Sequence, residues 1–242
     1  MTATGSTEVS RHENPPPPPW VMIPWPGAAV ALAAAAVMVV ASVVAWPEMA
    51  VEIVTREANG RHGESVAHRG VTAVAAPSAL LGLTVLFSVG LRADHELLKR
   101  TPAVLDRSPE RVRKVLSWTL MGLSVVVVVL HLGLLSLHTG DAYPLENAMA
   151  AAGGLLLVCL GVAAPLFAPG GSYTGGLERF RAAQGRLYRD AGIALVLAGI
   201  ATAVAAAFDP WVAMGIAVGA VAVVFLVVGI AAAVQAARRP PE

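Results

Sequence analysis

Charged residues are scarce in this chain of 242 residues. Asp, Glu, Lys and Arg make up 14% of it, whereas hydrophobic residues make up 56% and the mean hydropathy is +0.68. An ordinary soluble domain has about a quarter of its residues charged. Cysteine is scarcer still: Cys159 stands alone, which excludes an intrachain disulfide. The composition therefore predicts a membrane protein whose external parts are held without disulfides.

The chain also lacks the residue patterns on which catalysis commonly depends. It contains no Gly-x-Ser-x-Gly, no His-Glu-x-x-His and no glycine-rich phosphate loop before a helix. We therefore expect neither an enzyme nor a bound cofactor. A metal site is not expected either, because no helical spacing and no cysteine supports His62, Glu64 and His68 as ligands.

Six long apolar stretches take the place of such motifs. Each is close to the ~20 residues that a helix needs to cross a hydrocarbon core, and the apolar residues within them favour no single face. Pro77 and Pro165 interrupt two stretches, which membrane helices tolerate when neighbours satisfy the freed carbonyls. Only Asp209 and Pro210 separate the last two, which predicts a tight helical hairpin. We predict an all-α, polytopic bundle of six transmembrane helices at residues 27–46, 71–90, 115–137, 147–168, 191–208 and 211–236.

Lys and Arg alternate between the segments that connect these stretches. From the N-terminus, the seven segments carry 1, 3, 7, 0, 4, 0 and 2 of the 17 basic residues. Positively charged loops tend to stay in the cytoplasm, and placing both termini inside puts 14 of the 17 there. The first stretch reads as a retained anchor, since no clear small-x-small site follows it. The chain is therefore predicted to lie N-in and C-in in its membrane, with cytoplasmic tails at 1–26 and 237–242, an external loop at 47–70 and the six-helix membrane domain at 27–236.

Basic residues cluster where the predicted helices meet the cytoplasmic headgroups. Ser108-Pro109-Glu110 is typical of a helix start, with a capping hydroxyl, a proline and an acid in the first turn. Residues 177–189 have the pattern of a short amphipathic helix lying in the interface, and an anion or lipid-headgroup site is the alternative. Each inner-leaflet anchor contributes on the order of 1 kcal/mol. The predicted anchors are Arg111, Arg113, Lys114, Arg179, Arg181 and Arg186.

No Asp, Glu, Lys or Arg lies inside the six stretches, which counts against a proton- or ion-coupled transporter. His131 is the exception to this apolar character, with Ser124 and His138 seven residues away on the same helical face. A packing histidine bonded to a neighbouring helix is the favoured interpretation. The alternative is a cleft of Ser124, His131 and His138 in a small transporter or channel subunit. Gly215 and Gly219 form a small-xxx-small pair, which predicts close helix packing and is compatible with a helix-mediated oligomer.

The external loop contains nearly balanced charges of both signs, which argues against a nucleic-acid partner. Asn59 and Gly60 predict a tight turn, since both tolerate positive φ. Arg56, Arg61 and Arg69 are the only basic residues expected on the external face. These five positions are the candidate recognition residues of the loop.

The loop and its setting resemble those of a bacterial membrane domain that often forms the N-terminal part of SdpI-type immunity proteins. The resemblance extends over most of residues 40–208, and Arg56 stands where that family has His. It implies a non-enzymatic, six-helix, N-in protein of the bacterial plasma membrane that recognises a secreted peptide toxin and signals to a membrane-held regulator. The matching segments are Trp46-Pro47-Glu48, Val51 to Thr55, Asn59-Gly60-Arg61, Arg69 before the helix with Pro77, and Arg181 to Gly192 with Gln184, Arg186 and Tyr188.

A third function also fits the sequence. Pro15 to Pro19 are five consecutive prolines, which favour a stiff polyproline II spacer in the N-terminal tail. Such a tail is compatible with a membrane scaffold or assembly factor. Apart from the lipid bilayer, the expected partners are thus a secreted peptide or a membrane-associated regulator.

Overall fold

The computed structural model describes residues 23–56, 65–100, 109–168 and 176–237, and in these ranges the chain is almost entirely helical. Six of its helices are long and apolar enough to cross a membrane, which confirms a multi-pass, predominantly α-helical membrane protein. The helices are α1 (Trp25–Ala45), α2 (Arg69–Arg100), α3 (Pro109–Thr139), α4 (Leu145–Ala163), α5 (Gly176–Ala205) and α6 (Pro210–Ala237). A short 3-10 helix, η2 (Ala164–Phe167), continues directly from α4.

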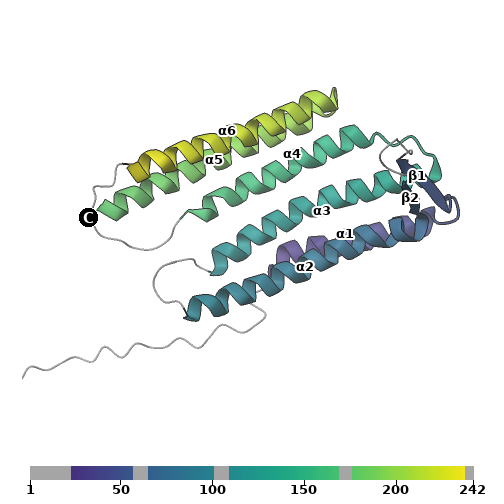
Figure 1. Cartoon of the computed structure of the whole chain (residues 1–242), viewed down its shortest axis with the longest axis horizontal. Helices are drawn as coiled ribbons and strands as arrows, with labels where there is room; N and C mark the ends of the chain where they lie inside the picture. Colours follow the sequence, from purple (N-terminus) through teal and green to yellow (C-terminus); the bar gives the residue numbers. More distant parts are fainter. Residues whose placement is uncertain (1–22, 57–64, 101–108, 169–175, 238–242) are drawn as a thin grey trace, which may run out of the picture.

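The helices form two groups of three in an antiparallel bundle (Figure 1). Helices α1, α2 and α3 all contact one another and are called the N-terminal triad below. Helices α4, α5 and α6 likewise contact one another and form the C-terminal triad. The two triads meet mainly where α3 packs against α4 and η2.

All turns between successive helices in the described chain lie at one end of the bundle (Figure 1). This hairpin end contains the segment between α1 and α2, the α3–α4 connection and the α5–α6 turn. The opposite, terminal end contains the start of α1 and the end of α6, as an even number of crossings requires. The bundle therefore has two chemically distinct ends.

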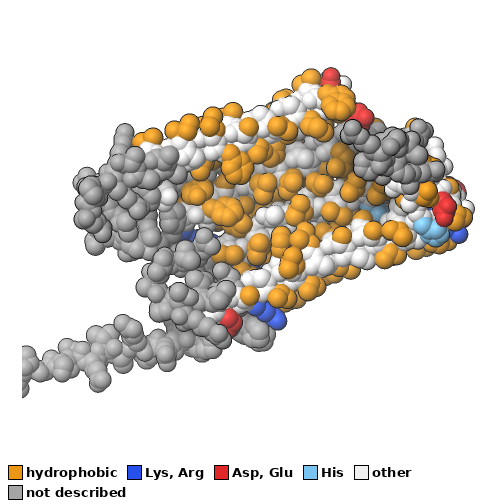
Figure 2. Space-filling model, in the orientation of Figure 1, with side chains coloured by type: hydrophobic (Ala, Val, Ile, Leu, Met, Phe, Trp, Pro, Cys, Tyr) orange, Lys and Arg blue, Asp and Glu red, His pale blue; other side chains and the backbone are white. Residues whose placement is uncertain are grey.

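The outside of the bundle is apolar along most of its length (Figure 2). Charged side chains in this view gather toward the two ends, and hydrophobic side chains cover the helices between them. Helix α6 contacts only α5 and α4 among the elements with extensive packing, so Val218, Phe225 and Leu226 are all exposed. Such a surface suits contact with the hydrocarbon of a lipid bilayer.

Several helices are longer than their apolar stretches. Helix α2 continues to Arg100, and α3 begins at Pro109, one residue after the predicted capping serine. The predicted separate interface helix at 177–189 is wrong, because this segment is the first part of a continuous α5. Backbone hydrogen bonding carries the helix past the point where hydropathy falls. Gly215 and Gly219 do not pack closely, since a Cβ at either position would meet open space.

The predicted hairpin between the last two helices is confirmed. Asp209 Oδ1 accepts hydrogen bonds from the backbone N–H groups of Trp211 at 2.8 Å and Val212 at 3.2 Å. The aspartate thus satisfies two of the donors that the first turn of α6 leaves free, and Pro210 occupies the first helical position. This cap ends one apolar run and starts the next.

The segment between α1 and α2 contains the β-structure of the described chain. Strand β1 (Glu52–Arg56) pairs antiparallel with β2 (Ser65–His68), with Glu52 opposite His68 and Val54 opposite Val66. The ladder is irregular between Val54 and Arg56. β-Branched residues at 51, 53, 54 and 55 are the sequence signal for this hairpin, which the loop prediction did not include.

Candidate functional site

A polar node joins the three helices of the N-terminal triad. His131 of α3 is fully buried, with Nε2 2.9 Å from Ser42 Oγ and 3.1 Å from the Met38 carbonyl oxygen of α1. Because a carbonyl can only accept, Nε2 carries the proton and donates. Ser42 Oγ in turn donates to the Ala73 carbonyl of α2 at 3.5 Å. His131 is thus bonded to a neighbouring helix, as expected for the favoured interpretation of a packing histidine.

The Ala73 carbonyl needs this partner because of Pro77. Proline has no N–H, so the carbonyl four residues earlier loses its helical hydrogen bond. Ser42, on the neighbouring helix, supplies a replacement. The node thus combines a proline in α2, a serine in α1 and a histidine in α3, while His131 Nδ1 has no partner among the described residues.

Ser124 and His138 share a face of α3 with His131 but do not extend this node. Ser124 is buried and donates to the Leu120 carbonyl of its own helix at 2.7 Å. His138 has its own set of partners, described next. The three residues line neither of the two grooves described below.

His138 fastens the base of the β-hairpin to two helices. Its Nδ1 donates to the Ala50 carbonyl at 3.0 Å, and its own carbonyl accepts from the Ala50 N–H at 2.9 Å. With Nδ1 protonated, Nε2 accepts from the Thr72 hydroxyl of α2 at 2.9 Å. The tautomer is therefore the opposite of that at His131, and it links α3, α2 and the chain entering β1.

Arg69 also holds the base of the β-hairpin, where its two strands join α1 and α2. Its guanidinium lies 4.6 Å from the centre of the Trp46 ring, and Nη1 donates to the Met49 carbonyl at 3.4 Å. Its backbone N–H donates to the Val51 carbonyl at 2.9 Å. A guanidinium over an indole face gives a favourable cation–π contact. Arg69, a predicted recognition residue, is thus placed to hold the two ends of the hairpin together.

The other predicted recognition residues lie toward the tip. Arg56 is the last residue of β1 and pairs with Ser65 in the ladder. Its side chain, like Asn59, Gly60 and Arg61, lies outside the described residues. The tight turn predicted at Asn59-Gly60 also falls there. Of the three residues considered and not favoured as metal ligands, only His68 is described, and its Nδ1 accepts from the Gly70 N–H at 3.1 Å.

The predicted cytoplasmic anchors that the structure describes lie at the terminal end. Arg111 Nη1 donates to the Ala168 carbonyl at 3.0 Å, which ties the start of α3 to the chain after η2. Lys114 pairs with Glu110 at 2.9 Å on the exposed surface of α3. Arg113 is also engaged in an interaction, and Arg186 is exposed. The side chains of Arg179 and Arg181 lie outside the described residues.

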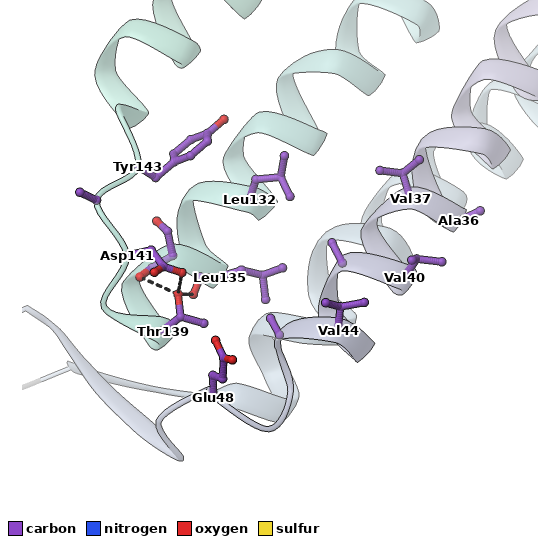
Figure 3. A pocket seen from close by; sticks show the side chains of 14 residues that line it. Ala36, Val37, Val40, Val44, Glu48, Leu132, Leu135, Thr139, Asp141 and Tyr143 are labelled. Atoms are coloured by element: carbon purple, nitrogen blue, oxygen red, sulfur yellow. Dashed lines mark hydrogen bonds between the residues drawn. The ribbon is translucent and has the colours of Figure 1, made fainter.

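Two grooves flank α1 at the hairpin end. The α1–α3 groove has a volume of 790 Å³, and its mouth contains Glu48 and Asp141 (Figure 3). The α1–α2 groove has a volume of 560 Å³ and includes Ser42 of the polar node and Pro77 in its wall. Both are lined mainly by apolar side chains. The hairpin end therefore offers apolar grooves beside a fastened β-hairpin.

The C-terminal triad is built differently, through glycines that the sequence analysis did not single out. A Cβ at Gly154 would lie 2.6 Å from the Gly199 carbonyl oxygen, and one at Gly161 would lie 2.6 Å from that of Gly192. The reciprocal contacts from α5 to α4 are equally close. The two contacting glycines of α4 are seven residues apart in the sequence, and so are the two contacting glycines of α5. This spacing was the available signal.

The hairpin end presents three kinds of surface. The hairpin offers strand edges, the grooves offer apolar surface, and Glu48, Glu52, Asp141 and Glu146 offer negative charge. Among the described residues there is no group of three His, Cys, Asp or Glu side chains placed to hold a metal ion. Comparison with protein-family models, with curated proteins and with solved structures finds no match to this chain.

Proposed function

We propose that this chain is a non-enzymatic plasma-membrane protein of SdpI-like type that recognises an extracellular peptide with its hairpin end. The proposal combines the sequence resemblance of the loop with the arrangement of its base. The proposal includes cytoplasmic termini. This orientation is supported by the basic residues at the terminal end, Arg92, Arg111, Arg113, Lys114 and Arg186.

One observation carries the proposal: the hairpin is fastened to the bundle at both of its ends. His138 holds the chain at Ala50, where β1 is about to begin. Arg69 follows β2 directly and contacts Trp46 and Met49 on the incoming side. A loop whose ends are fixed loses less conformational freedom when it binds a partner. This is the construction expected of a recognition element.

The transporter alternative has less support from the same geometry. The residues suggested for its cleft are Ser124, His131 and His138, and each forms hydrogen bonds within the bundle, although His131 Nδ1 has no described partner. Their bonds fix helix against helix or a serine to its own backbone. A polar path across the membrane would need such groups to face a shared opening. The scaffold alternative rests on the N-terminal tail, which lies outside the described residues.

The proposal is tested in a bacterium that is sensitive to the secreted peptide toxin of an SdpI-type system. Cells expressing the full chain are expected to survive in supernatant that contains the toxin. Replacing residues 52–68 by a Gly/Ser segment of equal length should abolish survival, while the chain still reaches the membrane. Arg186→Gln, at the terminal end, serves as the control and should protect fully. Survival that is unaffected by the hairpin replacement contradicts the proposal.

A further inference from the structure

The α1–α3 groove has the dimensions of a site for one lipid chain. Its α1 wall runs from Ala36 to Ala45, which at 1.5 Å per residue corresponds to about 13 Å. One leaflet of a hydrocarbon core is about 15 Å deep. The wall facing α1 comes from Leu132 and Leu135 of α3 (Figure 3). The groove therefore runs from the hairpin end to roughly the depth of one leaflet.

The floor of the groove is open on its outer side. Val37, Val40 and Val44 of α1 line it and remain 53%, 61% and 73% exposed. Because α1 crosses the membrane, these side chains face hydrocarbon. An acyl chain can therefore enter from the side, without any opening of the helices. Burying the valines against such a chain requires no hydrogen-bonding group on the ligand.

The mouth of the groove is acidic. Glu48 and Asp141 are both exposed there, and Figure 3 shows the two side chains at the same end of the groove, beside Thr139. The Thr139 hydroxyl donates to Asp141 Oδ2 at 2.6 Å and so fixes its orientation. Neither carboxylate forms an ion pair with any residue that the structure describes. Two carboxylates at one opening, without an ion-pair partner among the described residues, favour a cation that can donate several hydrogen bonds.

We propose that the α1–α3 groove binds a phospholipid whose headgroup carries a primary ammonium, as in phosphatidylethanolamine. One acyl chain lies along Val37, Val40 and Val44, and the ammonium donates to Glu48 and Asp141. A primary ammonium has three N–H donors. A choline headgroup has the same charge but no donor, and an anionic glycerol headgroup is repelled by the carboxylates. The order of preference is therefore ethanolamine, then choline, then glycerol.

Native mass spectrometry of the full chain in detergent tests this site. The protein is titrated with phosphatidylethanolamine, phosphatidylcholine and phosphatidylglycerol of identical acyl composition. We expect phosphatidylethanolamine to bind about fivefold more tightly than phosphatidylglycerol, because two exposed charge contacts favour the ethanolamine headgroup. The double variant Glu48→Gln/Asp141→Asn should remove this preference. Val40→Trp, which fills the groove, should weaken the binding of all three lipids.

A matched control removes two negative charges from the same end of the bundle. Glu52→Gln/Glu146→Gln changes exposed residues outside the groove and should leave the ethanolamine preference intact. Equal loss in both double variants would show a general charge effect and overturn the site. The site would also be overturned by unchanged binding of phosphatidylethanolamine to Val40→Trp, or by tighter binding of phosphatidylglycerol than of phosphatidylethanolamine. A dimer that excludes lipid would overturn it as well. None of these outcomes depends on toxin protection, so the lipid site and the proposed function fail separately.

Discussion

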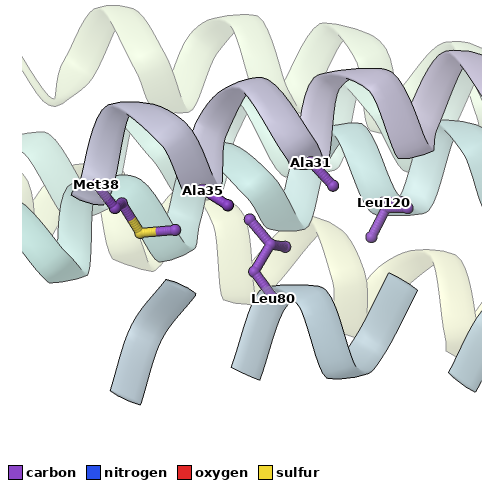
Figure 4. Packing of buried hydrophobic residues seen from close by; sticks show 5 residues of the cluster. All are labelled: Ala31, Ala35, Met38, Leu80 and Leu120. Atoms are coloured by element: carbon purple, nitrogen blue, oxygen red, sulfur yellow. The ribbon is translucent and has the colours of Figure 1, made fainter. Parts of the chain in front are cut away.

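The two triads are both helical and apolar, yet they are held together by different means. In the N-terminal triad a core of Ala31, Ala35, Met38, Leu80 and Leu120 (Figure 4) lies beside hydrogen bonds that run from helix to helix. In the C-terminal triad glycines bring the backbones of α4 and α5 into direct contact. Lipid tails are as apolar as leucine, so helix association in a membrane depends on close packing and on interhelical hydrogen bonds. This protein uses one of these means predominantly in each triad.

Hydrogen bonding in the N-terminal triad begins at the terminal end and continues to the hairpin end. Ser117 of α3 accepts from the Gly27 N–H of α1 at 2.7 Å and lies 3.4 Å from the Pro24 carbonyl. The His131 node follows further along α3, and His138 follows seven residues later. Helix α3 therefore presents a bonded position at three levels. Its partners are helices and the base of the hairpin.

The C-terminal triad has fewer such bonds among its described residues. Asn147 donates to the Ala206 carbonyl at 2.6 Å, beside a small cluster of Ala150, Ala206 and Ala213. The remaining contacts come mainly from small residues that allow the backbones to approach. Such packing is intolerant of added volume, whereas hydrogen-bonded packing is intolerant of a lost partner. Substitutions can therefore distinguish the two triads.

The largest effect is expected where a methyl group is added between α4 and α5. Gly154→Ala places a Cβ 2.6 Å from the Gly199 carbonyl oxygen and 2.8 Å from the Ala203 nitrogen, so the helices must separate. We expect the free energy of unfolding to fall by about 3 kcal/mol. Far-UV circular dichroism during titration of mixed micelles with a denaturing detergent measures it.

The neighbouring residue provides the control for this substitution. A Cβ at Gly153 meets no atom within 4 Å, so Gly153→Ala should leave the stability unchanged or slightly higher. Equal losses in the two variants would mean that the α4–α5 contact is not the sensitive element. The distinction between the triads would then lose its basis.

A smaller effect is expected from the polar node, and it should depend on Pro77. Ser42→Ala removes the donor that faces the Ala73 carbonyl and should cost about 1 kcal/mol of unfolding free energy. In a Pro77→Ala background, residue 77 regains its N–H and can bond to Ala73 within α2. Ser42→Ala should then cost less, because only its contact with His131 Nε2 is lost and that nitrogen still bonds to the Met38 carbonyl. The double-mutant cycle, measured by the same unfolding titration, isolates this coupling.

Ser124→Ala is the matched control for the cycle. Ser124 is also a buried serine of the N-terminal triad, but its hydroxyl bonds to its own helix. Its removal should show no dependence on Pro77. If Ser42→Ala costs the same with and without the proline, the serine does not act by satisfying the freed carbonyl, and the account of the node is wrong.

Much of the fold could be predicted because its determinants are local. Each apolar stretch is about as long as one bilayer crossing, so the stretches predict the number of helices. Asp209 and Pro210 predict the last turn, because these residue types are typical of a helix start. The length of α5 could not be predicted in this way. Hydropathy falls before residue 190, but a helix continues for as long as its backbone bonds are made. The β-hairpin was missed because its strands are short and their pattern is brief.

The sequence identified one residue of the polar node, but not the residues to which it bonds. A buried histidine in a membrane helix needs a hydrogen bond, which singled out His131. Its partner Ser42 lies 89 positions away in sequence, so only the tertiary arrangement identifies it. The same limit explains the glycines. Gly215 and Gly219 have the better-known spacing but face open space, whereas Gly154 and Gly199 meet because α4 and α5 are antiparallel neighbours.

The smallest effect should be confined to the hairpin end. Thr72→Val keeps the shape of the side chain but removes the hydroxyl that donates to His138 Nε2. A loss of about 0.6 kcal/mol is expected, which corresponds to roughly threefold faster amide exchange where the base of the hairpin opens locally. Hydrogen-exchange mass spectrometry should detect it in peptides that contain Ala50 and β1.

Thr84→Val separates this effect from the general loss of a threonine in α2. Thr84 donates to the Leu80 carbonyl of its own helix, so its replacement should leave exchange at Ala50 unchanged. Exchange in α4 and α5 should not respond to either variant, because glycine contacts rather than side-chain bonds hold those helices. Faster exchange throughout the C-terminal triad in Thr72→Val would show that the two triads unfold as one unit. The two triads would then differ in how their helices pack, but they would not differ in stability.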